Sequence, residues 1–173
     1  VLSQILYFLT NFSSRINFWF KNDSIMKKII LCILFLIPTV TFANIIAECE
    51  SPKGHAYYPF YGVIPDEKSG WDTDGFSTGV YRLILNDDQS FDVVFSNSNG
   101  QYVSAVQDGA EVIPFSMDEN QISLMVVYMG NAIEVFSFVK DNAGRKELIF
   151  TQTKTGIVPK VAAYRGSCSR LDI

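Results

Sequence analysis

The sequence has few of the residues that build common catalytic and metal sites. Its 173 residues include one histidine, His55, and three cysteines. A zinc site would therefore have to combine His55 with carboxylates alone, and a Ser-His-Asp triad would have to use His55 as its base. No serine lies in a nucleophile-elbow pattern. We therefore expect no catalytic residues, metal or cofactor, and we favour a non-enzymatic role over an enzymatic one.

Basic residues are scarce in the larger part of the chain. Four of the 14 basic and one of the 18 acidic residues precede Asn44, so residues 44–173 hold 10 basic and 17 acidic residues, a net charge of −7. Such an acidic surface repels phosphate backbones, and no basic run is present that would attract anionic lipids. We expect neither a nucleic-acid partner nor, once the leader is removed, a membrane partner.

Long apolar runs are also rare, and the clearest one, residues 29–37, is too short to span a bilayer comfortably. Met26-Lys27-Lys28 precedes it, and Thr41-Phe42-Ala43 follows it with small residues at the spacing of a cleavage site. This layout predicts a signal peptide over residues 26–43, cut near Ala43. Residues 1–25 are then an upstream segment from a start site placed too early, and residues 44–173 are a secreted or periplasmic domain. The alternative is a genuine extension that makes the run a signal anchor.

The cysteines allow a simple interpretation once the leader is set aside. Cys32 lies in the apolar run, which leaves Cys49 and Cys168 near the two ends of the 130-residue domain. In an oxidising compartment two cysteines have one intramolecular pairing. A disulfide that closes nearly the whole domain is worth about 4–5 kcal/mol in the chain-entropy model. The alternative is two unrelated buried thiols.

No long segment shows the 3.6-residue period of an amphipathic helix. Short runs of alternating or continuous apolar residues, separated by turn residues, predict strands instead. Short connections favour antiparallel pairing of neighbours. We therefore expect an all-β, single-domain antiparallel meander of about eight strands, closed as a barrel or packed as a sandwich. The predicted strands cover residues 78–85, 91–95, 101–107, 111–115, 121–129, 132–140, 145–153 and 157–164.

The alternation within these strands also predicts the core. Tyr81 and Leu83 share one face of their strand, and Phe136 and Phe138 share a face of another. Asp108-Gly109 predicts a hairpin between its two flanking strands. Pro114 lacks an N–H group, so the strand that contains it should be short or lie at an edge.

Residues 51–77 form the longest stretch without clear strand alternation, and they are rich in aromatic residues and glycine. Long ordered loops are often functional, and aromatic side chains can stack on sugars or bases or anchor a protein. We therefore predict a binding module for a small molecule, a glycan or a protein. The alternative is that this loop covers one end of the barrel and completes the core. The candidate ligand-binding residues are His55, Tyr57, Tyr58, Tyr61, Trp71, Asp72 and Asp74.

Acidic motifs offer weaker candidates. Asp72-Thr73-Asp74-Gly75 resembles the start of a calcium loop, but Tyr81 occupies the position that requires a bidentate glutamate. Asp87-Asp88 and Asp118-Glu119 could in principle serve a hydrolase, yet both pairs lie in predicted turns, where acids are common. A turn role explains all of these residues.

The segment Ser96-Asn97-Ser98-Asn99-Gly100-Gln101-Tyr102 resembles the Ser/Gly-rich loop before a tyrosine in small periplasmic C-type lysozyme inhibitors. The resemblance covers seven residues and does not extend to the surrounding strands, so it assigns no family. It implies a second function of a different class, an inhibitor of a secreted hydrolase. An uncharacterised hydrolase is the third possibility.

Overall fold

Ten β-strands dominate the computed structural model of the chain, which describes residues 44–97 and 99–173. All the strand pairs are antiparallel, which confirms the predicted all-β antiparallel fold, with ten strands where the sequence predicted about eight. The elements are β1 (Asn44–Tyr58), the short 3-10 helix η1 (Asp66–Lys68), β2 (Gly70–Gly75), β3 (Val80–Leu85), β4 (Phe91–Ser96), β5 (Tyr102–Ser104), β6 (Glu111–Met117), β7 (Gln121–Tyr128), β8 (Ala132–Lys140), β9 (Lys146–Lys154) and β10 (Lys160–Leu171).

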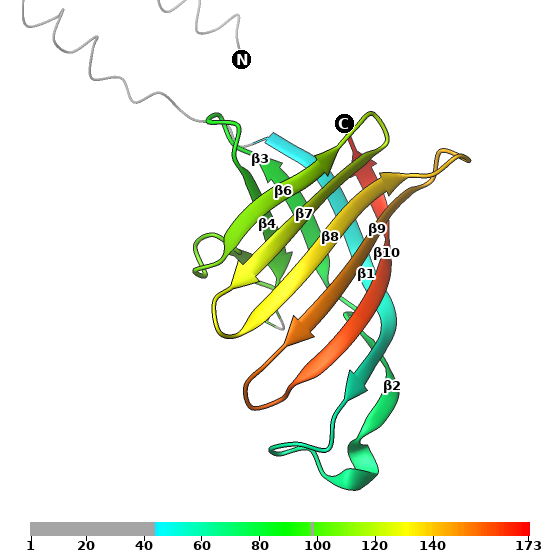
Figure 1. Cartoon of the computed structure of the whole chain (residues 1–173). Coiled ribbons are helices and arrows are strands. Elements are labelled where there is room, and N and C mark those ends of the chain that lie inside the picture. Colours follow the sequence, from blue (N-terminus) through cyan, green and yellow to red (C-terminus); the bar gives the residue numbers. More distant parts are fainter. Residues whose placement is uncertain (1–43, 98) are drawn as a thin grey trace, which may run out of the picture. The chain divides into compact units, whose positions relative to one another are not determined.

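The long strand β1 organises the sheet because it pairs with three others. It pairs with β10 on one side, and on its other side with β3 in its first half and β2 in its second half (Figure 1). A break at Ser51, which has a φ of 48°, separates the two halves. The Ser51 N–H donates to the carbonyl of Gly79 at 2.8 Å, and the Phe76 N–H donates to that of Pro52 at 2.8 Å. The break in β1 therefore accommodates the turn between β2 and β3.

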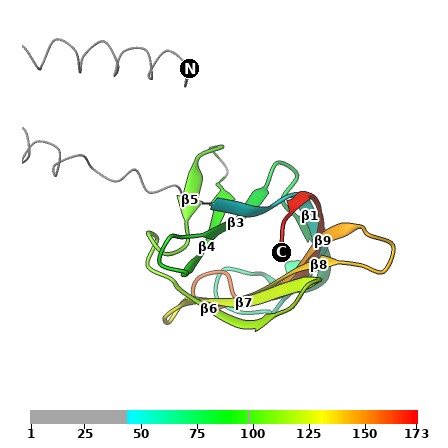
Figure 2. The ribbon, with the colours of Figure 1, turned by 90° about the horizontal axis from the view of Figure 1, so that it is seen from above.

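The sheet curls into a half-barrel (Figure 2). Its main strand order is β5-β4-β3-β1-β10-β9-β8-β7-β6, with β2 attached to β1 alone. No hydrogen-bonded ladder joins the edge strands β5 and β6 in the part of the chain that the structure describes, so the finer prediction of a closed barrel or a sandwich is not confirmed. The prediction from Pro114 is confirmed, because β6 is an edge strand.

The predicted hairpin at Asp108-Gly109 is wrong, because β5 and β6 lie at opposite edges of the sheet. The segment between them turns, but it is held against β4 instead of pairing its two flanking strands. Asp92 on β4 accepts hydrogen bonds from the Ser104 hydroxyl at 2.5 Å and from the Val106 N–H at 3.2 Å. These contacts direct the chain across the open side of the half-barrel.

Aromatic and aliphatic side chains fill the concave face. Phe136, Phe138 and Leu83 are fully buried, and Tyr81 is almost so, as the predicted strand faces require. Phe150 from β9 stacks on Phe136 with a ring-centroid distance of 5.0 Å. The centre of the half-barrel is thus a packed core, which moves the search for a binding site to its ends and its outer face.

The predicted disulfide between Cys49 and Cys168 is confirmed. The two residues lie opposite each other in the β1–β10 ladder and are separated by 119 positions in sequence. A cross-link over such a span is worth about 5 kcal/mol in the chain-entropy model. It therefore fixes the strands that begin and end the described part of the domain.

The prediction that residues 51–77 lack strands is wrong. β1 continues to Tyr58 and β2 begins at Gly70, so only residues 59–69 connect the two strands. Aromatic residues on both faces hide the alternation of this hairpin. The predicted signal peptide (residues 26–43), the upstream segment (residues 1–25) and Cys32 lie outside the described residues.

Candidate functional site

The seven predicted site residues lie on the β1–β2 hairpin, but the hairpin divides them between two faces. In the register, Tyr57 pairs with Trp71, His55 with Thr73, and Gly54 with Asp74. Because successive side chains of a strand point to opposite faces, His55, Tyr57 and Trp71 lie on the outer face. Tyr58, Asp72 and Asp74 belong to the inner face, and Tyr61 lies in the connecting loop. The predicted residues therefore do not form one site.

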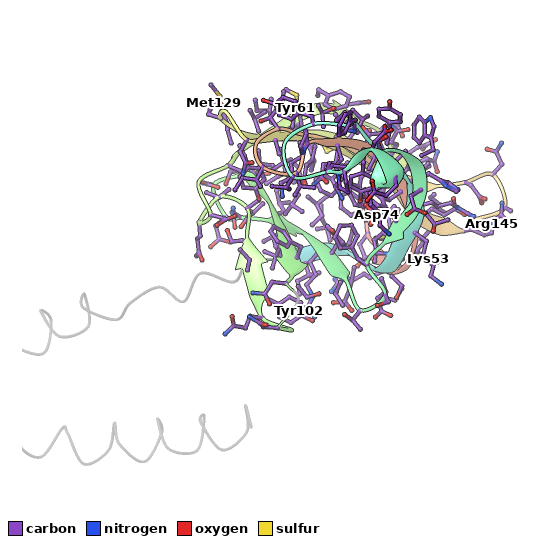
Figure 3. All side chains as sticks on the ribbon, turned by 90° about the horizontal axis from the view of Figure 1, so that it is seen from below. Lys53, Tyr61, Asp74, Tyr102, Met129 and Arg145 are labelled. Carbon is purple, nitrogen blue, oxygen red and sulfur yellow. A yellow bond between two sulfur atoms is a disulfide. The ribbon has the colours of Figure 1, made fainter. Side chains whose placement is uncertain are left out.

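Asp74, which is labelled in Figure 3, is the centre of a polar cluster on the inner face. One of its carboxylate oxygens accepts hydrogen bonds from the Tyr164 hydroxyl at 2.6 Å, Lys160 Nζ at 2.8 Å and the Tyr58 hydroxyl at 3.0 Å. Its other oxygen accepts the N–H of Gly75 at 2.8 Å. Lys160 also donates to the Tyr164 hydroxyl at 2.8 Å. The carboxylate is thus satisfied by the protein, and we call this set the inner cluster.

The inner cluster depends on a glycine. Gly54 lies on β1 between Asp74 of β2 and Tyr164 of β10, its partners in the two neighbouring ladders. A Cβ atom at this position would lie 1.8 Å from the carbonyl oxygen of Ala163, far inside contact distance. The absence of a side chain lets β1 and β10 approach closely, and the Asp74 carboxylate meets the Tyr164 hydroxyl across it.

The pKa values of the inner cluster follow from burial and hydrogen bonding. Burial opposes ionisation of Asp74, but the hydrogen bonds from Lys160 and Tyr164 outweigh it and lower its pKa to about 2. Burial, reinforced by the hydrogen bond to Asp74, raises the pKa of Tyr58 to about 12. The same two causes raise the pKa of Tyr164. Near neutral pH the cluster therefore holds an ion pair and two neutral phenols, which suits a structural role.

Lys160 and Tyr164 were not predicted as site residues. They lie on β10, 86 and 90 positions from Asp74, and no local pattern in the sequence indicates that they approach it. Their spacing of four does place both on one face of a strand. Recognition of the Cys49–Cys168 bond as the link between β1 and β10 was the signal that could have located them.

The outer face of the hairpin exposes large rings. Trp71 is 71% exposed and Tyr57 is 42% exposed, and their ring centroids lie 5.6 Å apart in an edge-on arrangement. The loop adds Phe60 and Tyr61, which are 69% and 66% exposed. Val161, the partner of Tyr57 on β10, continues this apolar row across the sheet.

The β9–β10 turn extends the same apolar area. A Cβ atom on Gly62 would lie 3.2 Å from the carbonyl oxygen of Ile157, so the two connecting segments are adjacent. Both segments carry exposed apolar side chains. The β1–β2 hairpin protrudes from the rest of the sheet (Figure 1). We call the combined area the outer aromatic surface, and it consists of Tyr57, Phe60, Tyr61, Val63, Trp71, Ile157, Val158 and Val161.

The remaining acidic candidates have local roles. Asp72 accepts the N–H of Thr73 at 2.7 Å, and Asp88 accepts both the N–H and the hydroxyl of Ser90 at 2.9 and 2.6 Å. Asp118 likewise accepts the N–H of Asn120 at 2.7 Å. Among residues 44–97 and 99–173, no three His, Cys, Asp or Glu side chains are placed to hold a metal ion.

The turn that resembles the lysozyme inhibitors is closed by Asn97, whose side-chain oxygen accepts the N–H groups of Asn99 and Gln101 at 2.9 and 3.0 Å. Tyr102 at its end is half exposed, and the Arg82 guanidinium lies 4.2 Å from the centre of its ring. Tyr102 and Tyr61 lie on opposite sides of the half-barrel (Figure 3), so this turn is separate from the outer aromatic surface.

In the described part of the chain no helix has the length and apolar character needed to cross a membrane. Comparison of the chain with protein-family models, curated proteins and solved structures returned no match.

Proposed function

We propose that this chain is an exported, non-enzymatic binding module that recognises a protein partner through the outer aromatic surface. The observation that carries the proposal is the exposure of Trp71 and Tyr57 on a paired, protruding hairpin. Trp and Tyr dominate binding hot spots because they bring a large apolar area with few rotatable bonds. Contiguous exposed apolar surface of this kind marks interaction sites in soluble proteins.

A protein suits this surface better than a glycan does. The rings of Tyr57 and Trp71 meet at 63° and form no flat double platform for a sugar. The exposed aliphatic side chain of Val161 lies opposite Tyr57 in the β1–β10 ladder, so the rings continue into aliphatic surface, as in the apolar centre of a protein interface. The net charge of −7 over residues 44–173 favours a basic partner, because complementary charge raises the association rate.

Photo-cross-linking in the producing cells tests the proposal. A photoreactive phenylalanine analogue at position 61 should give a covalent adduct with a basic protein, whereas the same analogue at position 102, on the opposite side of the half-barrel, should not. The double substitution Tyr57→Ala and Trp71→Ala should remove the adduct while circular dichroism shows an unchanged sheet. Equal adducts from both positions, or an adduct that persists in the double variant, would contradict the proposal.

Export is part of the proposal, and it is supported by the leader-like sequence of residues 26–43 together with the Cys49–Cys168 bond. N-terminal sequencing of the protein recovered outside the cytoplasm should give a chain that begins near Asn44. A chain that retains Met26 would instead indicate a signal anchor.

The half-exposed ring of Tyr102, held against Arg82, favours one alternative, an inhibitor that presents the turn before Tyr102 to a secreted hydrolase. Immobilised C-type lysozyme should then retain the chain and lose activity, and Tyr102→Ala should abolish both effects. Retention that depends on Trp71 instead would support the outer aromatic surface, and no retention would remove the alternative.

A further inference from the structure

A cleft of about 370 Å³ lies at one end of the half-barrel, where β3 and β8 begin and β4 and β9 end, beside the packed core. The β2–β3 turn forms one wall, and the ends of β4, β8 and β9 form the others. Three rings line it, with Tyr81 edge-on to Phe76 at 6.0 Å and stacked with Phe95 at 6.2 Å between ring centroids. Its polar residues include Glu134 and Gln152.

Glu134 and Gln152 are neighbours in the β8–β9 ladder, and both face the cleft. The Gln152 side-chain amide donates to one carboxylate oxygen of Glu134. A carboxylate can only accept hydrogen bonds, so this contact orients the side-chain amide of Gln152 with its nitrogen toward Glu134 and its Oε1 away from Glu134. Within the described residues Oε1 of Gln152 is buried and has no hydrogen-bond donor. Such an unsatisfied buried acceptor is uncommon and requires an explanation.

The charge of Glu134 is also uncompensated at short range. None of the ion pairs within the described residues includes Glu134, and the nearby Lys160 is committed to Asp74 at 2.8 Å. Burial raises the pKa of Glu134, although the Gln152 hydrogen bond and the charges of Lys160 and Lys154 oppose that rise. A cation placed beside Glu134 would favour the ionised carboxylate and so offset the free-energy cost of burying it.

We propose that this cleft binds a small organic ammonium ion, with Glu134 as its anionic anchor and the rings of Tyr81 and Phe95 against its apolar part. An ammonium group supplies the hydrogen-bond donors that Glu134 and, after a small side-chain adjustment, Gln152 require. Aromatic faces attract cations as well as apolar groups. One carboxylate and one amide are too few ligands for Ca²⁺, and an anionic ligand would be repelled. This inference does not depend on the function proposed for the outer face.

Isothermal titration of the full chain with benzylammonium, benzyl alcohol and benzoate tests the charge requirement without any substitution. The three probes have nearly the same shape and differ in charge. We expect benzylammonium to bind at least tenfold more tightly than benzyl alcohol, and benzoate not to bind. Equal affinity for the ammonium and the alcohol, or no heat of binding with benzylammonium at millimolar concentration, would overturn the proposal.

Substitutions then locate the site. Glu134→Gln should weaken benzylammonium binding at least tenfold, whereas Glu111→Gln, at an exposed position on β6, and Trp71→Ala should leave it unchanged. If Glu134→Gln fails to fold, the site can be located instead from the NMR chemical-shift changes that benzylammonium causes in the unsubstituted protein. Benzylammonium should move the side-chain signals of Glu134 and Tyr81 and leave the Trp71 indole unmoved. Unchanged affinity in Glu134→Gln, or shifts confined to the Trp71 face, would contradict the assignment.

Discussion

The two faces of the β1–β2 hairpin carry similar residue types and behave in opposite ways. On the inner face, Asp74 accepts hydrogen bonds from Tyr58 and from Lys160 and Tyr164 of β10. On the outer face, Tyr57 and Trp71 contact each other and remain 42% and 71% exposed. A one-residue difference in strand position thus separates a satisfied structural network from a surface that is free to bind.

This contrast shows that the density of aromatic residues in a segment does not by itself locate a site. Residues 57 and 58 are both tyrosines, yet the pleat sends their rings to opposite faces. The inner rings help to hold the hairpin on the sheet, which gives the outer rings a fixed position. We expect substitutions on the inner face to affect stability and those on the outer face to affect binding.

Gly54→Ala should cause the largest loss in the free energy of unfolding, because it disturbs the strand that carries both faces of the hairpin. Its Cβ would lie 1.8 Å from the Ala163 carbonyl, so β1 and β10 must separate. Overpacking of this severity costs about 3 kcal/mol or more. Urea unfolding monitored by circular dichroism measures the loss. The matched control is Lys53→Ala, an exposed neighbour, for which the change should stay within about 0.5 kcal/mol. An unchanged Gly54→Ala variant would show that the strands do not approach as closely as described.

Asp74→Asn should cause the next largest loss in the free energy of unfolding. It keeps the shape of the side chain but leaves the Lys160 ammonium without its counter-charge in a partly buried position. The free energy of unfolding should fall by about 2–3 kcal/mol, less than for a fully buried pair. His55→Ala, on the outer face of the same hairpin, is the control and should change stability little. Similar losses in both variants would remove the distinction between the two faces.

The acid dependence of stability should be specific to the inner face. The Asp74 pKa of about 2 in the folded chain is below its ordinary value of 3.8. The ionised form therefore stabilises the fold above about pH 4, and this contribution disappears as the pH falls from about 4 to 2. After allowance for solvent screening it amounts to about 1–2 kcal/mol. The difference in unfolding free energy between the unsubstituted chain and Asp74→Asn should shrink over this range. A constant difference would contradict the assignment.

The sequence was sufficient for the fold class, most strands and the disulfide, because each depends on local alternation or on a simple count. Leu83 and Phe136 face the core as their strands predict, and Cys49 had a single partner available. The hairpin was missed because aromatic residues occupy both of its faces, so residues 55–58 show no apolar alternation. Pro52 and Gly54 also suggest a loop, whereas here they accommodate a break and a close strand contact.

The candidate site was predictable only in part for a related reason. Tyr57, Tyr61 and Trp71 could be named from composition, and the structure leaves them exposed. That Tyr58 and Asp74 belong to a different environment depends on Lys160 and Tyr164, which only the β1–β10 pairing brings near. The Glu134–Gln152 pair likewise depends on a ladder register that no sequence pattern specifies.

The smallest effect on stability should come from Trp71→Ala, and it is the sharpest test of the outer face. Trp71 is the only tryptophan in residues 44–173, so Trp19→Phe gives a full-length chain with a single fluorescent reporter. Its emission should be red-shifted, as expected for a ring that is 71% exposed, and should shift to the blue when a partner covers it. Because its ring contacts chiefly Tyr57, Trp71→Ala should cost no more than about 0.5 kcal/mol. A loss above about 1.5 kcal/mol would mean that the ring is structural, and the proposed binding role of this face would lose its basis.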